Sequence, residues 1–552
     1  MSARGVSARG VSARSEGVHG AAADAGFVAV AVALSLAVHL AALGFYSDDW
    51  DLLARMALAG DQTFGGLYRV LSGEGQLLMR PGQKAYEALL FRAFGLAPLG
   101  YHVVNAAVLV LTGVLFLLSL RALGLSRRAS VATALLYSLL PHYSSARVWF
   151  ASFQAPLSMA AYFLSLYAGL RSIRSAGATA WTWLAVSLAG LIASALAYEV
   201  ALPLFLLNAL LYEWRRRSVA RARTAHVTVW STAAAALTVA AFKMLATTRL
   251  SGGLTLGYLH GMVEQIARIN LWVYGVGAPL TIRAALSGAG AAALLMALAL
   301  ALGTWLYLSA MPLSASAGSG RSPGWLVAGG AAVFLLGHAV FLTTNVSFSA
   351  TGADNRTAIA SAAGLALAWV GIAVWMTERL PKGVTAAWRA RAFAGLTAAS
   401  CAGAFVVSAR LARDWGAAYG RARRVVADIR RSFPTLAPGT ALVLDGICRY
   451  VGPAPVFEAP WDLRGALQLA YGDSTLAADI VSPTLRVEDD GVHTVVYGED
   501  SRYPYGRLVV YDARRHTADT LADARAARAY FAEHGRGDAC PPGRPGHGAR
   551  VF

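Results

Sequence analysis

Apolar residues follow one another in long runs along this chain, rather than in the narrow stripes that mark the elements of a soluble protein. From Phe27 onward these runs are roughly 17–22 residues long, and short basic segments separate them. A helix of about 20 apolar residues crosses a hydrocarbon core about 30 Å thick. We therefore predict an all-α polytopic membrane protein with about eleven transmembrane helices. The predicted spans are 27–46, 101–121, 130–146, 151–170, 181–197, 199–214, 226–245, 286–310, 325–343, 357–377 and 391–409.

The composition agrees with this pattern. Hydrophobic residues make up 57% of the 552 residues and charged residues only 14%, which would be very unusual for a soluble core. The net charge of +18 comes largely from arginines between the spans, at 121–128, 171–174 and 215–223. These clusters follow the positive-inside rule, so we expect membrane lipids and no nucleic acid as partners. Only three of the 48 basic residues are lysines, which is typical of a GC-rich bacterium.

The basic segments also predict an orientation in the membrane. If the Arg-rich N-terminus is cytoplasmic, the segments 121–130, 171–180, 215–225, 311–324 and 378–391 all lie inside, and each contains Arg or Lys. Residues 1–26 repeat Gly, Ser and Arg without an apolar face and are predicted to be a disordered cytoplasmic tail. Residues 27–409 form the transmembrane domain, and 47–100 form its first extracytoplasmic loop.

Hydropathy falls after about residue 410, and an odd number of spans places residues 410–552 outside. Three β-branched runs, at 440–445, 492–497 and 507–511, are bounded by Gly, Pro and Asp, and a helical pattern follows at 519–533. We predict a small extracytoplasmic α/β or mainly β domain. Cys448 and Cys540 in this region could form a disulfide if the region is outside.

Three carboxylates close the first span, in the sequence FYSDDWD at 45–51. In one interpretation Asp48 or Asp49 is a general base that accepts the proton of an acceptor hydroxyl, or the pair holds a divalent metal such as Mg²⁺ or Mn²⁺. In the other, Ser47 caps a new helix whose first turn accepts Asp48, Asp49 and Asp51 through the helix dipole. The local sequence leaves both open.

The segment 79–95 is predicted to be an amphipathic helix that begins at Pro81, ends at Gly95 and lies along the outer membrane surface. Arg80 and Lys84 are one turn apart on it, so they could present two cations to a lipid phosphate. The alternative is ordinary snorkelling of both side chains to the headgroups.

Other polar groups are predicted at the same height of the membrane. Ionisable groups are costly there unless they are paired, so each is a candidate for function as well as for structure. The orientation assigns nearly all of them to one extracytoplasmic cavity. These residues are His102, Asn105, His142, Arg147, Glu199, Lys243, His338, Asp354 and Arg356. The chain contains no Walker A loop and no GxGxxG in a βαβ context, so a cytoplasmic nucleotide-sugar enzyme or an ATP-driven pump is unsupported.

Several segments together resemble the GT-C superfamily of membrane glycosyltransferases, which includes protein O-mannosyltransferases, aminoarabinose transferases of lipid A and oligosaccharyltransferases. The segments are SDDW at 47–50, RP at 80–81, GLAPLGYHVVN at 95–105, RALGLSRRAS at 121–130 and YEVALP at 198–203. The last has Tyr198 where the family has a basic residue. The resemblance covers roughly the first 215 residues through these motifs and the rest by architecture.

The resemblance implies a polyprenyl-phosphate-sugar donor, a lipid, glycan or protein acceptor, and an extracytoplasmic active site in the plasma membrane. It also implies Asp48 or Asp49 as the catalytic carboxylate, and Arg80, Lys84 and Arg356 as ligands of the carrier phosphate. Glu199 is the next candidate for the catalytic base. The expected reaction is an inverting transfer, which needs only one carboxylate. A glycan polymerase or ligase shares the donor and remains an alternative. A transporter or flippase would show broken helices or inverted repeats, and we find no convincing repeat.

Overall fold

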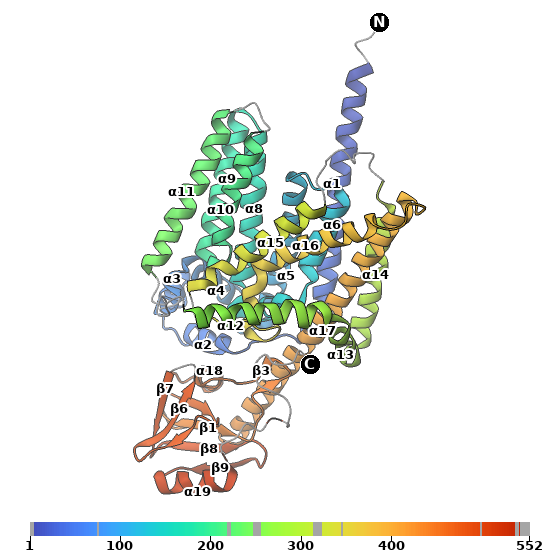
Figure 1. Cartoon of the computed structure of the whole chain (residues 1–552). Helices are drawn as coiled ribbons and strands as arrows, with labels where there is room; N and C mark the ends of the chain where they lie inside the picture. Colours follow the sequence, from blue (N-terminus) through green and yellow to red (C-terminus); the bar gives the residue numbers. More distant parts are fainter. Residues whose placement is uncertain are drawn as a thin grey trace.

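A bundle of long helices and a small α/β domain beside one end of it make up the protein (Figure 1). The computed structural model describes residues 5–73, 77–217, 222–246, 255–312, 323–343, 346–496, 499–535 and 540. The helices of the bundle and its loops are α1 Gly5–Ala37, α2 Asp48–Ala57, α3 Phe64–Leu71, α4 Pro81–Phe94, α5 Pro98–Ala122, α6 Arg127–Leu139, α7 Ser145–Val148, α8 Gln154–Arg174, α9 Gly177–Ala197, α10 Leu202–Arg216, α11 Ala222–Ala246, α12 Leu256–Ala267, α13 Ala278–Gly288, α14 Ala291–Ala310, α15 Pro323–Ala339, α16 Ile359–Glu378 and α17 Ala386–Ser432.

Each predicted span corresponds to a helix, but fewer helices than predicted could cross a membrane alone. Among the described residues, eight helical segments are long and apolar enough to do so. The predicted spans 130–146 and 199–214 are α6 and α10, with 13 and 15 residues. At 1.5 Å per residue these helices are only about 20–23 Å long. They stop short because Pro141 and Pro203 accompany breaks in the helical backbone at the end of the bundle that faces the α/β domain.

The N-terminal prediction differs from the structure. Residues 5–26, expected to be disordered, form the first part of helix α1, which extends beyond the bundle at the end opposite the α/β domain (Figure 1). The segment contains no proline, so the hydrogen bonding of the span can continue toward its N-terminal side. Residues 1–4 of the predicted tail lie outside the described residues.

Helix α17 crosses a predicted boundary. We expected the transmembrane domain to end at residue 409, and this 47-residue helix continues past that point without a break to Ser432. Its length is about 70 Å, far more than a bilayer requires. The second half of α17 therefore belongs to the α/β domain, where it packs on β2 Tyr450–Val451, β3 Ala454–Pro455 and α18 Pro460–Tyr471.

The C-terminal domain confirms the predicted α/β class. Its main sheet has the order β4-β1-β8-β9, in which β4 Ala477–Ile480, β1 Ala441–Asp445 and β8 Leu508–Asp512 are parallel, and β9 Thr517–Thr520 is antiparallel to β8. A second sheet contains β5 Arg486–Val487, β6 Gly491–Val496 and β7 Glu499–Pro504, and α19 Ala524–His534 is the last helix. Helix α18 lies in the crossover from β1 to β4, as parallel strands require. Cys448 and Cys540 form a disulfide.

The two domains share one apolar core. Tyr46 and Trp149 from the bundle pack with Trp415 of α17 and with Phe457 and Leu463 of the C-terminal domain. All five side chains are buried. Burial of large aromatic and aliphatic groups is the main stabilising term in such contacts. The C-terminal domain is therefore held against the first loop of the bundle.

Candidate functional site

A cavity of about 510 Å³ lies between the bundle and the C-terminal domain. Its charged lining combines five cations with three carboxylates, so the net charge of these side chains is +2. The cations are Arg55, Arg80, Lys243, Arg356 and Arg464, and the carboxylates are Asp48, Asp51 and Glu199. The cavity thus brings together four of the predicted site residues, Asp48, Arg80, Glu199 and Arg356, from segments that are far apart in the sequence.

The turn before α2 separates the roles of the two neighbouring aspartates. Asp49 is fully buried, and its carboxylate accepts hydrogen bonds from the backbone N–H of Tyr46 at 2.9 Å and of Ala151 at 2.7 Å. Burial raises the pKa of Asp49 well above its usual range, against these hydrogen bonds. Asp49 therefore ties the first loop to the segment after α7 and does not line the cavity. A shared metal site of Asp48 and Asp49 is not formed here, because the oxygens of Asp49 accept backbone N–H groups.

Asp48 faces the cavity and is only half-buried. Burial raises its pKa to about 6, while the charge of Arg356 acts in the opposite direction. The indole N–H of Trp461 donates to Asp48 Oδ1 at 2.9 Å. Ser47, which we considered as a helix cap, instead donates its hydroxyl to Glu458 at 2.6 Å, and its backbone has a φ of 48°. Only Asp48 of the predicted pair is thus placed to meet a bound molecule.

Glu199 lies between two cations at the opposite wall. Its carboxylate accepts hydrogen bonds from both Arg80 Nε, at 3.0 Å, and Lys243 Nζ, at 3.2 Å, and Arg80 Nη2 completes a two-pronged pair. The guanidinium of Arg80 also stacks 4.6 Å from the ring of Tyr198. Although burial acts to raise it, the two cations lower the pKa of Glu199 to about 2. Glu199 therefore holds the cations in place and is a poor base.

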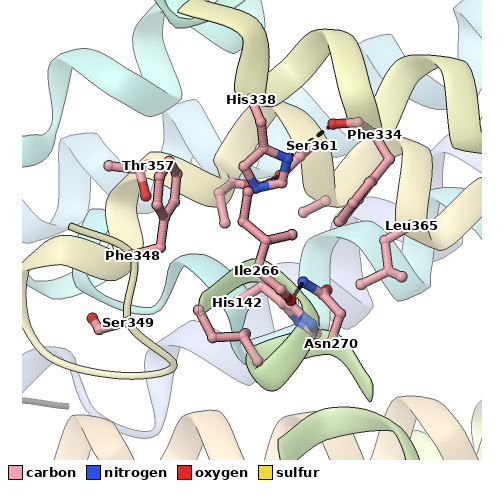
Figure 2. Close-up of a pocket in the computed structure, with 13 residues that line it drawn as sticks. His142, Ile266, Asn270, Phe334, His338, Phe348, Ser349, Thr357, Ser361 and Leu365 are labelled. Atoms are coloured by element: carbon pink, nitrogen blue, oxygen red, sulfur yellow. Dashed lines mark hydrogen bonds between the residues drawn. The ribbon is translucent and has the colours of Figure 1, made fainter. Parts of the chain in front are cut away.

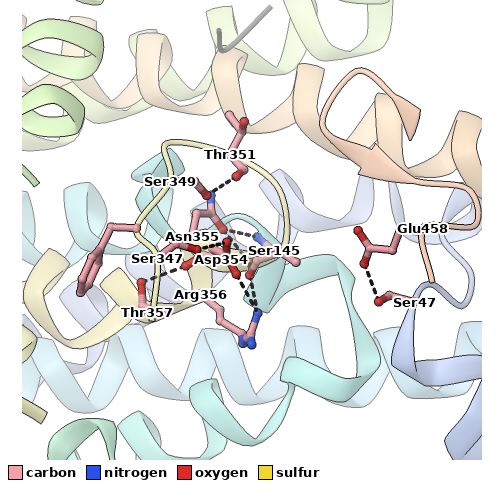
Figure 3. A network of polar contacts seen from close by, with 12 residues as sticks. Ser47, Ser145, Ser347, Ser349, Thr351, Asp354, Asn355, Arg356, Thr357 and Glu458 are labelled. Carbon is pink, nitrogen blue, oxygen red and sulfur yellow. Dashed lines mark hydrogen bonds and ion pairs between the residues drawn. The ribbon is translucent and has the colours of Figure 1, made fainter. Parts of the chain in front are cut away.

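Arg356 supplies a third cation from the loop before α16. Its guanidinium donates to the carbonyl of Ala353 at 2.8 Å and lies 4.8 Å from the ring of Trp149. The loop itself is fixed on α7, because Asn355 Oδ1 accepts hydrogen bonds from the hydroxyl of Ser145, at 2.6 Å, and from its backbone N–H, at 3.0 Å (Figure 3). These contacts leave the outer face of the guanidinium toward the cavity, which it lines.

Part of the cavity lining is apolar. It includes side chains from α10, α11, the end of α15 and the segment after it, namely Leu202, Pro203, Ala240, Met244, Ala339, Val340, Phe341 and Val346. Helices α15 and α16 approach closely at small residues: a Cβ on Gly337 would lie 2.4 Å from the backbone of Ser361. This packing brings the apolar segment 339–341 next to Arg356 and Thr357 in the same wall. The cavity lining therefore combines cations with apolar side chains.

The structure also places residues in the cavity that the sequence did not single out as a site. Trp461 and Arg464 come from α18 of the C-terminal domain, and Arg464 pairs with Asp51 at 2.7 Å. Lys243 was a general candidate only, and its pairing with Glu199 gives it a specific place. No local pattern identifies Trp461 or Arg464, because their partners are 413 residues away in the chain.

Three of the predicted binding residues have structural contacts outside the cavity lining. Lys84 donates to the hydroxyl of Ser72 at 2.9 Å and lies 4.5 Å from the ring of Tyr68. A ring N–H of His102 donates to the carbonyl of Gly44 at 3.0 Å. Asn105 donates to the carbonyls of Ala146 and Arg147 at 3.1 and 3.3 Å. The contacts of His102 and Asn105 satisfy backbone carbonyls where helices begin or break.

His142 and Arg147 are also displaced from the predicted site. Arg147 donates to the carbonyls of Ser138 and Leu140 at 2.8 and 2.7 Å, where α6 ends. His142 lines a separate pocket with His338 and Asn270 (Figure 2). That pocket measures about 10 Å³, room for roughly one water molecule. Among the described residues, no group of three or more His, Cys, Asp or Glu side chains could hold a metal ion.

Comparison with known proteins gives a distant likeness. No protein-family model matches the chain, and no curated protein matches it. Two similar solved structures are ArnT from Cupriavidus metallidurans bound to undecaprenyl phosphate, with 17% identity and a TM-score of 0.38, and the same protein in the apo state, with 16% and 0.35. Both cover 80% of this chain, and 84% and 83% of ArnT. At this level of similarity, the likeness carries no information on the activity of this chain.

Proposed function

We propose that the chain transfers a sugar from a polyprenyl-phosphate carrier to an acceptor on the extracytoplasmic face of the plasma membrane. The observation that carries this proposal is a cavity whose lining combines Asp48 with several cations and with apolar side chains. A lipid-linked phosphate has matching chemistry, because its head is anionic and its chain is apolar. Such a molecule can diffuse within the membrane to a site at the end of a helical bundle.

The proposed step is an inverting displacement at the anomeric carbon. The acceptor oxygen attacks this carbon and forms the new glycosidic bond, and Asp48 takes the acceptor's proton. The bond between the anomeric carbon and the phosphate oxygen breaks, and its electron pair leaves with the polyprenyl phosphate. A carboxyl group with a pKa of about 6 is ionised at neutral pH and is a stronger base than an ordinary aspartate.

Arg80, Lys243 and Arg356 are proposed to stabilise the leaving phosphate. Negative charge develops on that oxygen as the bond breaks, and cations fixed in a partly desolvated site stabilise it more than water does. Glu199 fixes two of them before the donor arrives, so little reorganisation is needed during the reaction. We propose a lipid, glycan or protein as the acceptor. Analysis of the glycosylated product identifies which of these classes it is.

The test is a transfer assay with purified protein in lipid nanodiscs. The protein is incubated with a panel of polyprenyl-phosphate sugars, and release of the lipid phosphate is followed by mass spectrometry. We expect release with at least one sugar, accelerated by an added acceptor. A single added sugar on the product identifies a glycosyltransferase, whereas a transferred oligosaccharide identifies the polymerase or ligase alternative. In sealed proteoliposomes, movement of the intact donor across the membrane without cleavage would overturn the proposal.

A further inference from the structure

Helix α18 of the C-terminal domain lies directly on α2, the helix that begins with Asp48. The two helices approach so closely at Gly465 that a Cβ there would lie 2.4 Å from the backbone carbon of Trp50. Such an approach fixes the distance between the helices, because backbone atoms cannot move aside as a flexible side chain can. The side chains at the start of α18 are therefore held at a defined position relative to Asp48.

Three polar contacts connect this part of the C-terminal domain to the turn and first residues of α2. Trp461 donates to Asp48 at 2.9 Å, Arg464 donates to Asp51 at 2.7 Å, and Ser47 donates to Glu458 at 2.6 Å (the last contact is drawn in Figure 3). All three partners on the bundle side lie within five residues of one another. One of the three contacts is to the proposed catalytic carboxylate, and the other two are to its neighbours in the turn and first turn of α2.

The start of α18 is itself rigid. Asp462 is fully buried, and its carboxylate accepts hydrogen bonds from the backbone N–H of Glu458 at 2.6 Å and of Leu463 at 2.7 Å. Pro460 occupies the first turn, where its fixed φ suits a helix start. Leu463 is buried in the apolar core that both domains share. The indole of Trp461 therefore projects from a well-fixed first turn into the cavity.

We propose that α18 completes the active site and that Trp461 is a positioning residue, which holds Oδ1 of Asp48 so that Oδ2 meets the acceptor. This inference rests on the proposed function. In the described part of the chain, no hydrogen bond to Asp48 Oδ2 occurs, so this oxygen is available to accept a proton. The indole N–H also favours the charged form of the carboxylate, which is the form a general base requires. The C-terminal domain thus acts in the reaction through Asp48, without touching the donor phosphate.

The first test replaces Trp461 by Phe, which keeps an aromatic ring and removes the N–H. We expect kcat to fall about tenfold or more, since a hydrogen bond to a charged group is lost. The donor KM should change less than about twofold, because Arg80, Lys243 and Arg356 lie on other elements. The acid limb of the pH profile should move to higher pH, because a group that favours the ionised carboxylate is gone. A merely structural role for Trp461 would not move that limb.

Trp388→Phe is the matched control, because Trp388 is 61% exposed near the start of α17, away from the cavity lining. Wild-type kcat and an unshifted acid limb in a folded Trp461→Phe protein would overturn the inference. If wild-type protein cleaves no lipid-linked sugar, the proposed function fails instead, and the two failures are thereby distinct.

A second variant covers the case in which Trp461→Phe does not fold. Gly465→Ala does not change the side chains of Trp461 and Arg464. It forces α18 away from α2 at the point where the two helices are closest. We expect a lower kcat with a nearly unchanged donor KM, and the same upward shift of the acid limb. A folded Gly465→Ala protein with wild-type kcat and pH profile would show that α18 need not be seated on α2 for catalysis, and would overturn the inference.

Discussion

Asp48 and Asp49 are adjacent in the chain but have opposite surroundings. Successive residues at the start of a helix point about 100° apart, so one faces the cavity while the other faces the protein. Asp49 is occupied by backbone N–H groups, whereas Asp48 meets the cavity, Trp461 and the charge of Arg356. We therefore expect the same substitution, Asp to Asn, to have different effects at the two positions.

Asp48→Asn is expected to lower kcat by about 10²–10⁴, the usual contribution of a general base, with donor binding and thermal stability retained. Asn keeps the size and one acceptor oxygen but cannot take the acceptor's proton. Asp49→Asn should instead destabilise the fold by about 1–3 kcal/mol, because its amide N–H₂ would face a backbone N–H. Transfer rates, donor binding and melting temperatures of both variants check this. Near-normal turnover of folded Asp48→Asn would place the base elsewhere.

The raised pKa of Asp48 predicts a pH profile with a defined sign. Turnover should fall about tenfold per unit as the pH drops below about 6, because the carboxylate becomes protonated. Stability changes in the other direction. The folded state holds this proton more tightly than the unfolded chain, so the group contributes stability below its ordinary pKa of 3.8, and the contribution is lost as the pH rises through about 6. Asp48→Asn should remove both effects from kcat and from melting curves.

The role of a lysine that lines the cavity can be tested against that of a lysine outside the lining. Lys243→Gln should raise the donor KM about tenfold or more, since a charge-assisted contact with the phosphate is lost while Arg80 still pairs with Glu199. Lys84→Gln is the matched control: Lys84 contacts Ser72 and Tyr68 outside the cavity lining, so its donor KM should stay near that of the wild type. Equal effects of both substitutions, or none, would contradict this assignment. Initial rates over a range of donor concentrations measure both.

At the residue scale, the sequence predicted the part of the site that depends on local pattern. Asp48 and Asp51 of the acidic turn, Arg80, Glu199 and Arg356 all line the cavity. His102, Asn105 and Arg147 do not, because they satisfy carbonyls left free where helices begin or break. Sequence shows that a polar group is at the membrane interface, but not whether a broken helix nearby needs it.

At the scale of elements, the packing of α4 on the end of α9 sets the positions of Arg80 and Glu199 in the cavity. A Cβ on Gly82 would lie 2.9 Å from the backbone nitrogen of Ala197, so the two helices are in close contact there. Arg80 directly precedes α4, and Glu199 follows α9 by two residues. The close approach at Gly82 therefore brings this ion pair together.

Gly82→Ala should raise the donor KM several-fold, because overpacking of about 1–3 kcal/mol moves α4 and with it Arg80. Asp48→Asn and Lys243→Gln change the chemistry of a side chain in the cavity, whereas Gly82→Ala acts only through the position of a helix. Gly60→Ala is the control, since Gly60 has open space for a Cβ. Donor KM and melting temperature are the measurements. A folded Gly82→Ala protein with the donor KM of Gly60→Ala would contradict the proposed role of this contact.

The long elements were predictable because hydropathy alone specifies a helix in a membrane. All of the predicted spans are helical, and the helix at 79–95 is α4, which begins at Pro81 as expected. The breaks in the bundle were not predicted. The segment 140–153 consists of short helical turns between α6 and α8, and tertiary contacts, such as Asn355 with Ser145, help to hold it in that form.

At the scale of the whole molecule, the C-terminal domain was predicted in class but not in role. Its strands follow from β-branched runs, whereas its seat on α2 depends on partners more than 400 residues away. The predicted boundary at 410 falls inside α17, because hydropathy marks where a helix leaves the lipid and this helix continues beyond that point as a polar helix. The contact of α18 with α2 thus joins the helical bundle and the C-terminal domain, which hydropathy alone marks as separate regions.

The side of the membrane on which this domain lies can be tested through its cysteines. The chain has three, of which Cys448 and Cys540 form a disulfide and Cys401 is free and buried. Disulfides persist outside the cytoplasm and are rare within it, where thiols are kept reduced. If the domain is extracytoplasmic, as the positive-inside pattern predicts, protein denatured directly from cells in a thiol-reactive polymer reagent should carry one label, and prior reduction should raise this to three. The Cys448→Ser variant is the control, since loss of one partner should leave two reactive thiols with or without reductant. Three labels on wild-type protein without reductant would instead place the domain inside the cell, and the cavity beside α18 would then open on the cytoplasmic side, away from an extracytoplasmic acceptor.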